Sequence, residues 1–337
     1  MQLFLGTTVD GLQMGLCFAI LALGVYISYS ILDFPDLSVD GTFPLGGVCA
    51  TIFMLRLGVP PLLAILMAMA VGMLAGTVAG VLHVKCRISP LLSGIIVMTG
   101  LLSCNLALTK LLTRTGYTTT TFSYRSEGLA GIFHPAFLEE ATPAVRDIVT
   151  TAILLLFVLV CKLLIDLFLR TKLGYMLRAT GDNAQLVVAL GRDAGNYKIL
   201  GLALGNGLVA VSGALYAQLY MSYDNNSGSG KVVLALASVI IGLAVFSRLR
   251  FMRQTTAVVI GALIYSLCLN YLVLVDREGI YLKLLNAALF TVILLGNDRL
   301  VAWREKHAHR PAVHEKGEEE RVCCPCNTLI RPSIPAP

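Results

Sequence analysis

The chain has 337 residues, of which 56% are hydrophobic and only 14% are charged, and its mean hydropathy is +0.78. Because about a quarter of the residues in a soluble domain are charged, this composition excludes an ordinary soluble globular protein. The net charge of +6 lies in short segments between apolar runs, which indicates membrane topology and not nucleic-acid binding.

The apolar runs recur along the chain without the alternating pattern of β-barrel strands. A helix needs about 20 mostly apolar residues to cross the hydrocarbon core, where all backbone groups must be hydrogen-bonded internally. The runs lie at 9–31, 42–56, 59–84, 88–112, 147–169, 199–221, 232–247, 255–275 and 280–296. We therefore expect an all-α integral membrane protein, a polytopic bundle of about eight or nine transmembrane helices over 1–300, followed by a cytoplasmic tail over 301–337.

An acidic interruption follows the first run. Residues 33–41 read DFPDLSVDG and contain three acids and no base. Ionisable groups at membrane depth are costly and usually functional, so this segment is a candidate for the translocation pathway of a solute. The candidate pathway residues are Asp33, Asp36, Ser38, Asp40 and Thr42. The alternative is that these residues form turns and caps at the membrane surface.

Prolines and glycines in the second run indicate a broken, partly re-entrant segment near residues 33–47. Pro35, Pro44 and the Gly46-Gly47 pair interrupt a helix, and such backbone is tolerated at membrane depth only inside protein or along a cavity. The absence of basic residues gives no support to a cytoplasmic loop here. We therefore expect the segment to enter from outside, with the N-terminus inside and eight full crossings. The alternative, a full span at 42–56, gives nine crossings and an external N-terminus.

The basic residues of the later segments indicate which loops are cytoplasmic. Three basic segments are predicted to be cytoplasmic: Lys85 with Arg87, the loop 170–198, and the arginines at 248–253. They alternate along the chain with predicted external loops at 113–146 and 222–230. The same count places the C-terminus in the cytoplasm.

The glycines at 72, 76 and 80 are spaced for close helix packing.

Residues 9–52 and 199–245 share a pattern of helix, polar break and glycine-containing apolar segment. Paired interruptions of this kind point to a transport pathway.

The loop 170–198 is polar and carries five basic residues against two acids. Gly174 is expected to end the preceding helix, the segment 180–183 offers turn and N-cap chemistry, and Gly191 is expected to end a helical stretch at 184–190. This pattern predicts a short helix on the membrane face that contacts acidic groups of a partner protein. A plain solvated loop is the alternative.

This loop resembles the cytoplasmic loop of permeases in the branched-chain amino acid and ribose ABC importer superfamily. Its R-A-x-G-x-N pattern is carried by Arg178, Ala179, Gly181 and Asn183. The segment 36–41, DLSVDG, is similar to the family's D-L-S-V-G, with an inserted acid that sugar permeases lack. This form resembles a subgroup of tryptophan/tyrosine and uncharacterised transport permeases, and the resemblance covers most of residues 9–300.

The resemblance implies the permease subunit of an ATP-binding-cassette importer in the bacterial plasma membrane, without enzymatic activity or cofactor. The implied partners are two ATPase subunits, an extracytoplasmic substrate-binding protein and a second permease copy, identical or different. The substrate class would be an amino acid, and an aromatic one by the subgroup. The residues that would couple the chain to the ATPase are Arg178, Gly181, Asp182, Asn183, Ala184, Leu186, Ala189 and Gly191.

The competing function is a secondary transporter driven by an ion gradient without an ATPase. It would need charged relay residues well inside the later spans, which carry almost none. Gly230-Lys231 does not complete a phosphate-binding loop, because residue 225 is Asn and Val232 replaces the required Ser or Thr. The histidines and cysteines of the tail match no standard zinc spacing, so no metal site is expected.

Overall fold

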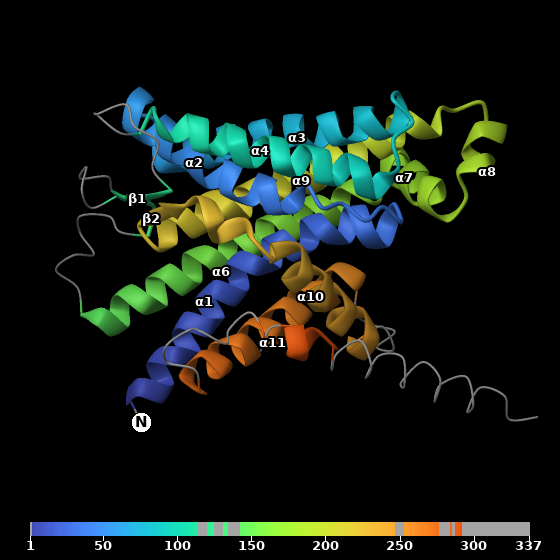
Figure 1. The fold of residues 1–337 in the computed structure, drawn as a ribbon. Helices are drawn as coiled ribbons and strands as arrows, with labels where there is room; N and C mark the ends of the chain where they lie inside the picture. Colours follow the sequence, from blue (N-terminus) through green and yellow to red (C-terminus); the bar gives the residue numbers. More distant parts are fainter. Residues whose placement is uncertain are drawn as a thin grey trace, which may run out of the picture.

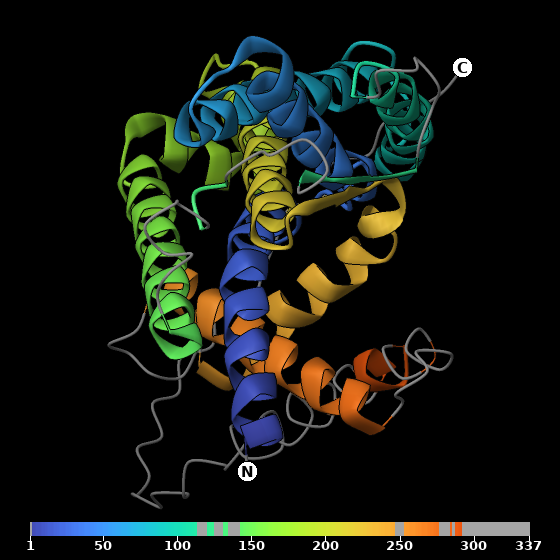
Figure 2. The ribbon, with the colours of Figure 1, turned by 90° about the vertical axis from the view of Figure 1, so that its left-hand side faces the viewer.

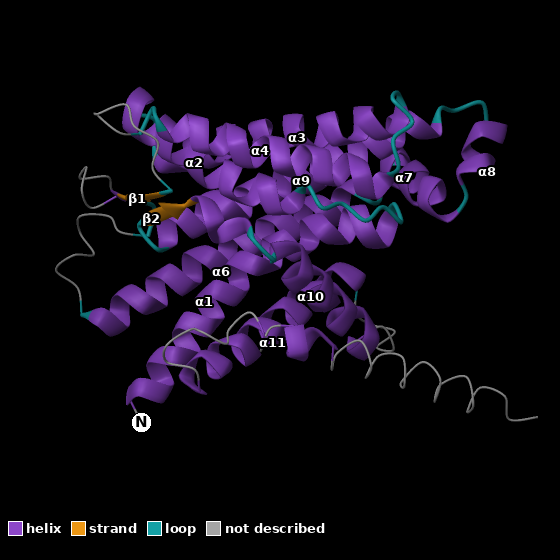
Figure 3. Cartoon of the chain, in the orientation of Figure 1, coloured by secondary structure: helices purple, strands orange, loops and turns teal. Residues whose placement is uncertain are grey.

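The computed structural model describes residues 2–112, 120–124, 131–133, 142–246, 253–275, 284 and 287–291. Within them the chain is a helical bundle with one small pair of strands (Figures 1 and 3). The helices are α1 (Gln2–Val25), α2 (Val39–Leu57), α3 (Pro61–Val84), α4 (Pro90–Thr109), α6 (Pro143–Phe168), α7 (Lys172–Asp182), α8 (Ala184–Ala189), α9 (Ala194–Leu219), α10 (Lys231–Phe246) and α11 (Gln254–Val275). The shorter elements are the π-helical turn η1 (Tyr26–Ile31), the 3₁₀ turn η3 (Asn225–Gly228) and the strands β1 (Thr121–Ser123) and β2 (Ser222–Asp224).

Seven helices in the described part of the chain are long and apolar enough to cross a membrane. The predicted all-α polytopic fold is confirmed. Helix α2, which contains Pro44 and Asp40, runs beside these seven but is not among them. The apolar run at 280–296 lies largely outside the described residues, as does the whole tail 301–337.

Helix α9 is the centre of the bundle. It packs against α1, α2 and α3. A side chain at Gly72 or Gly76 would strike the backbone of α9 at Asn206 or Leu202, and one at Gly80 would strike Ile199. The predicted packing role of these three glycines is therefore confirmed, since the close helix approach depends on their lack of a side chain.

The two ends of the bundle differ in structure. At one end β1 and β2 pair antiparallel, and Tyr124 beside β1 shares a hydrogen bond of 2.7 Å with Thr51 of α2. At the other end α7 and α8 project beyond the long helices (Figure 1). Viewed from the strand end, α9 lies next to α1, α2 and α3 (Figure 2).

The prediction that the N-terminus and the loop 170–198 lie on the same side is wrong. Helix α1 runs parallel to α6: Gln13 donates a hydrogen bond to Thr151 near the start of α6, and Tyr26 lines the same pocket as Asp166 near its end. The N-terminus therefore lies at the strand end, opposite α7 and α8 (Figure 1). The chain therefore reaches the acidic break from the α7 end of the bundle. Positive-inside reasoning failed because much of this acidic stretch is buried against α9 and does not form a free loop.

Candidate functional site

The break between η1 and α2 covers residues 32–38, which confirms a broken segment but makes it shorter than predicted. Asp33 adopts a left-handed conformation with φ of 51° and is exposed. The backbone N–H groups of Leu32 and Phe34 still bond the carbonyl groups of Ile27 and Ser28, at 3.2 and 2.9 Å. The π-helical turn thus extends into the break and supplies partners for its first residues.

Asp36 anchors the break to the middle of α9. Its Oδ1 accepts hydrogen bonds from the backbone and hydroxyl of Ser38, at 2.9 and 2.6 Å, and its Oδ2 accepts one from Nδ2 of Asn206 at 2.7 Å. Thr42 donates to Oδ1 of Asn206 at 2.8 Å. All four side chains are buried, so this network holds a carboxylate inside the bundle by saturating its acceptors.

Asp40 joins this break to the second one. Its carboxylate accepts hydrogen bonds from the backbone N–H groups of Gly230, at 3.0 Å, and Val232, at 2.8 Å, at the start of α10. A side chain on Gly228 would strike the carbonyl oxygen of Asp40, so the two interruptions lie in direct contact. Both segments are therefore helix, break and helix, as the sequence pattern predicts, and the breaks meet.

Lys231, the first residue of α10, points into a group of aromatic rings. Its ammonium lies 4.2 Å from the ring centre of Phe18 and 5.3 Å from those of Phe43 and Tyr216. Tyr220 stands beside Tyr216, with 4.6 Å between ring centres. We call Phe18, Phe43, Tyr216 and Tyr220 the aromatic cluster. Cation–π attraction stabilises the ammonium there, because a partly desolvated cation interacts more strongly with a ring face.

Asn105 of α4 bonds the first turn of α2, one residue after Asp40. Its Nδ2 donates to the carbonyl of Gly41 at 3.0 Å, while its Oδ1 is buried and has no partner among the described residues. A buried acceptor without a partner is costly, so Asn105 needs a donor that the described residues do not supply.

The short helix predicted at 184–190 is present as α8. Asn183 is its N-cap, accepting hydrogen bonds from the N–H groups of Gln185 and Leu186 at 3.0 and 3.3 Å. Gly191 follows the end of the helix with φ of +72°. Two details of the prediction are wrong. Gly174 lies inside α7, whose N-cap is Thr171, and residues 180–182 form the helical end of α7 where a turn was predicted.

The predicted coupling residues divide into an exposed group and a packed group. Leu186 is 53% exposed, and Asp182, Asn183, Ala189 and Gly191 are also exposed, as is Arg178 on α7. Gly181 is packed: a side chain there would strike the carbonyl oxygen of Ile31 in η1. Ala184 is half-buried. Helix α7 therefore connects the exposed α8 to the start of the acidic break.

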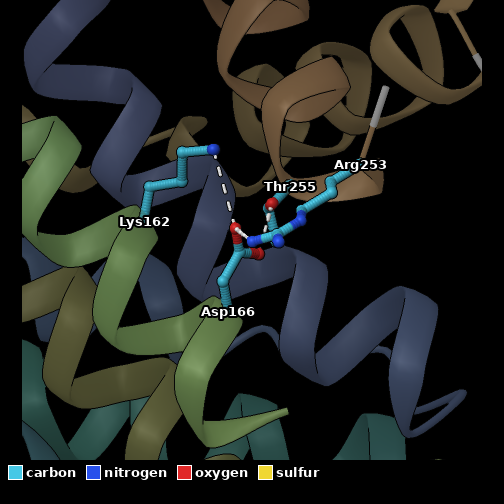
Figure 4. Close-up of polar contacts among 4 residues, drawn as sticks. All are labelled: Lys162, Asp166, Arg253 and Thr255. Carbon is cyan, nitrogen blue, oxygen red and sulfur yellow. Dashed lines mark hydrogen bonds and ion pairs between the residues drawn. The ribbon is translucent and has the colours of Figure 1, made fainter. Parts of the chain in front are cut away.

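Asp166 forms a separate polar centre near the end of α6. It accepts hydrogen bonds from Nη1 of Arg253 at 2.9 Å and from Oγ1 of Thr255 at 2.7 Å, and Lys162 lies 3.6 Å away (Figure 4). This centre joins α6 to the start of α11.

The sequence predictions identified the polar residues of the break but not the contacts that these residues make. Asp36, Ser38 and Thr42 come together on Asn206, whereas Asp40 bonds α10 and Asp33 stays exposed. The aromatic cluster and Lys231 were missed. A basic residue directly after a polar break, followed by a long apolar run, was the only available signal.

The family described as "Branched-chain amino acid transport system / permease component" matches residues 7–295. A "Tyrosine transport system permease protein" of Clostridioides difficile (strain R20291) is 38% identical over 311 residues, covering 92% of this chain and 98% of that relative. An uncharacterized protein of Rickettsia prowazekii (strain Madrid E) is 30% identical over 285 residues, covering 82% and 92%. No solved structure matches the chain.

Proposed function

The chain belongs to the branched-chain amino acid transport permease family, and from this membership we propose that it carries aromatic amino acids, tyrosine among them, into the cell. It is the multi-pass membrane permease of an ATP-binding-cassette amino acid importer and is not itself an enzyme. The observation that carries the aromatic assignment is the 38% identity to a tyrosine permease along nearly its whole length.

The aromatic cluster supports this choice of substrate. In our proposal the ring of the amino acid packs against the edge of the aromatic cluster, in which Phe18 and Tyr216 stack on each other with 5.9 Å between ring centres. Lys231 meets the substrate carboxylate, and the buried Oδ1 of Asn105, which lacks a donor among the described residues, accepts a hydrogen bond from its ammonium. Each group then receives the partner that its own charge or hydrogen-bonding capacity requires.

The acidic break is proposed to line the translocation pathway, with Asp33, Asp36, Ser38, Asp40 and Thr42 as its residues. Asp36 and Asp40 would shape the pathway without contacting the substrate, because their hydrogen bonds hold the break against α9 and α10. A change in the position of α7 would reach this region through the contact of Gly181 with Ile31.

Helix α8 is proposed as the element that binds the ATPase, of which two subunits would serve the transporter. The chain would lie in the bacterial plasma membrane, with α8 and the C-terminus both on the cytoplasmic side. An external binding protein would deliver the substrate at the strand end, and a second permease copy would complete the pore. The exposed apolar residues Leu186, Val188 and Leu190 favour protein contact, because a solvated surface helix of six residues has no need of them.

The test is co-purification of the partner ATPase with a variant carrying Leu186→Glu and Val188→Glu, at side chains that are 53% and 61% exposed. We expect the ATPase to be lost while the permease stays folded, because two buried charges would oppose docking. Leu57→Glu, at a leucine 60% exposed at the opposite end of the bundle, is the matched control and should retain the ATPase. Retention by the α8 variant would contradict the coupling role.

A further inference from the structure

We propose that the pocket between α6, α7, η1 and α11 binds the phosphate of an anionic phospholipid head group. This site is separate from the transport pathway and does not depend on the identity of the substrate. The pocket has a volume of about 430 Å³. Its lining residues are Tyr26, Asp166, Leu169, Arg170, Tyr175, Arg178, Arg253, Gln254 and Thr255.

The charge of the pocket favours an anion. Three arginines and one aspartate line it, which leaves two positive charges in excess. Asp166 is already satisfied by Arg253, Thr255 and Lys162 (Figure 4). Arg170 and Arg178 have no acidic partner among the residues that the structure describes, so their guanidinium groups are available. Arginine binds phosphate through two parallel hydrogen bonds, which gives this pair a preference for a phosphate group.

The position of the pocket favours a lipid as the source of that phosphate. It lies where α6 ends and α11 begins, at the α7–α8 end of the bundle, which the transport proposal places at the cytoplasmic membrane surface. Basic pockets between transmembrane helices on this side are suited to anionic head groups.

The neighbouring surface of α6 can accommodate the acyl chains. Leu163 and Leu167 are exposed on the face of α6 next to Arg170. A phospholipid whose phosphate lies between Arg170 and Arg178 would therefore place its chains along an apolar helix surface. Tyr175 lines the pocket and is exposed, and tyrosine is common at the membrane–water interface because its ring is apolar and its hydroxyl is polar.

Occupancy would tie three elements together. Arg170 follows α6, Arg178 belongs to α7, and Arg253 immediately precedes α11. A phosphate shared by these groups would hold α7, and with it α8, in a fixed position relative to the bundle. The lipid would thereby act on the element proposed to contact the ATPase.

The test is native mass spectrometry of the purified full chain with phosphatidylglycerol, phosphatidylethanolamine or inorganic phosphate. We expect phosphatidylglycerol to bind most tightly, and the double variant Arg170→Gln/Arg178→Gln to lose about tenfold in its affinity. The matched control is Lys172→Gln/Arg192→Gln, which removes the same charge from exposed residues of the same loop outside the pocket. A second variant, Arg170→Lys/Arg178→Lys, keeps the charge but loses the paired geometry and should recover only part of the affinity.

Three results would overturn the proposal. One is an equal affinity for phosphatidylglycerol in the Arg170→Gln/Arg178→Gln variant and in its Lys172→Gln/Arg192→Gln control. Another is equally tight binding of inorganic phosphate, which would make the source a soluble anion. The third is loss of the ATPase from the Arg170→Gln/Arg178→Gln variant with lipid binding unchanged, which would assign the pocket to a protein partner.

Discussion

Asp40 is a single carboxylate on which two interrupted helices depend. It satisfies N–H groups at the start of α10 from its position in the first turn of α2. The residue is therefore a helix cap supplied from another helix. Such a cap fixes the relative position of two breaks that lie about 190 residues apart in the sequence.

Replacing this cap should reduce stability without preventing folding. Asp40→Ala leaves the N–H groups of Gly230 and Val232 without their acceptor, at an expected cost of about 0.5–2 kcal/mol in the free energy of unfolding. Thermal unfolding in detergent measures the effect. Asp33→Asn, at an exposed residue of the same break whose left-handed backbone asparagine also tolerates, is the control and should change little. Equal melting temperatures for the two variants would show that Asp40 is not a cap.

Lys231 is the residue on which substrate recognition depends most strongly in our proposal. Lys231→Gln should lower tyrosine uptake by about tenfold or more, because an uncharged amide replaces the partner of the substrate carboxylate. Uptake of labelled tyrosine into vesicles measures this effect. Lys172→Gln, at an exposed lysine on α7, should transport normally. Normal uptake by the Lys231 variant would remove this residue from the pathway.

At the scale of elements, α7 is the connection between α8 and the break. Gly181 approaches the carbonyl of Ile31 so closely that an added Cβ would strike it. Gly181→Ala should therefore displace α7 from η1, so that the ATPase still binds but transport falls. Uptake and ATPase co-purification measured on the same preparation separate these two effects. Gln185→Ala, at an exposed position of α8, is the control. Unchanged uptake by Gly181→Ala would mean that the contact between Gly181 and Ile31 does not transmit movement from α7 to the break.

The helices could be predicted from the sequence, and most of the contacts between them could not. The apolar run at 59–84 became α3 (Pro61–Val84), because hydrophobic length alone dictates a span. The contact between Asp36 and Asn206 joins residues 170 positions apart, and no local pattern encodes it. The sequence signals costly groups such as Asp36, whereas the partner that satisfies them is set by how the helices pack. For the same reason the position of Lys231 over the aromatic cluster was not predictable.

At the scale of the whole molecule, the N-terminus lies at the strand end of the bundle, opposite α7 and α8. We expect a cysteine introduced at position 2, in a cysteine-free chain, to react with an impermeant maleimide from outside right-side-out vesicles. A cysteine at position 185 on α8 should react only after permeabilisation. Position 226, exposed in η3 beside the strand end, is the control for external labelling. Labelling of positions 2 and 185 from the same side would contradict this topology.

The central claim is that this chain imports an aromatic amino acid only when a partner ATPase drives it. Its most direct test is accumulation of labelled tyrosine in proteoliposomes that contain the chain, its ATPase subunits and its binding protein. We predict accumulation that requires ATP on the α8 side and that disappears in the Leu186→Glu/Val188→Glu variant. Accumulation by the chain alone, driven by an ion gradient without ATP, would contradict the account and identify a secondary transporter.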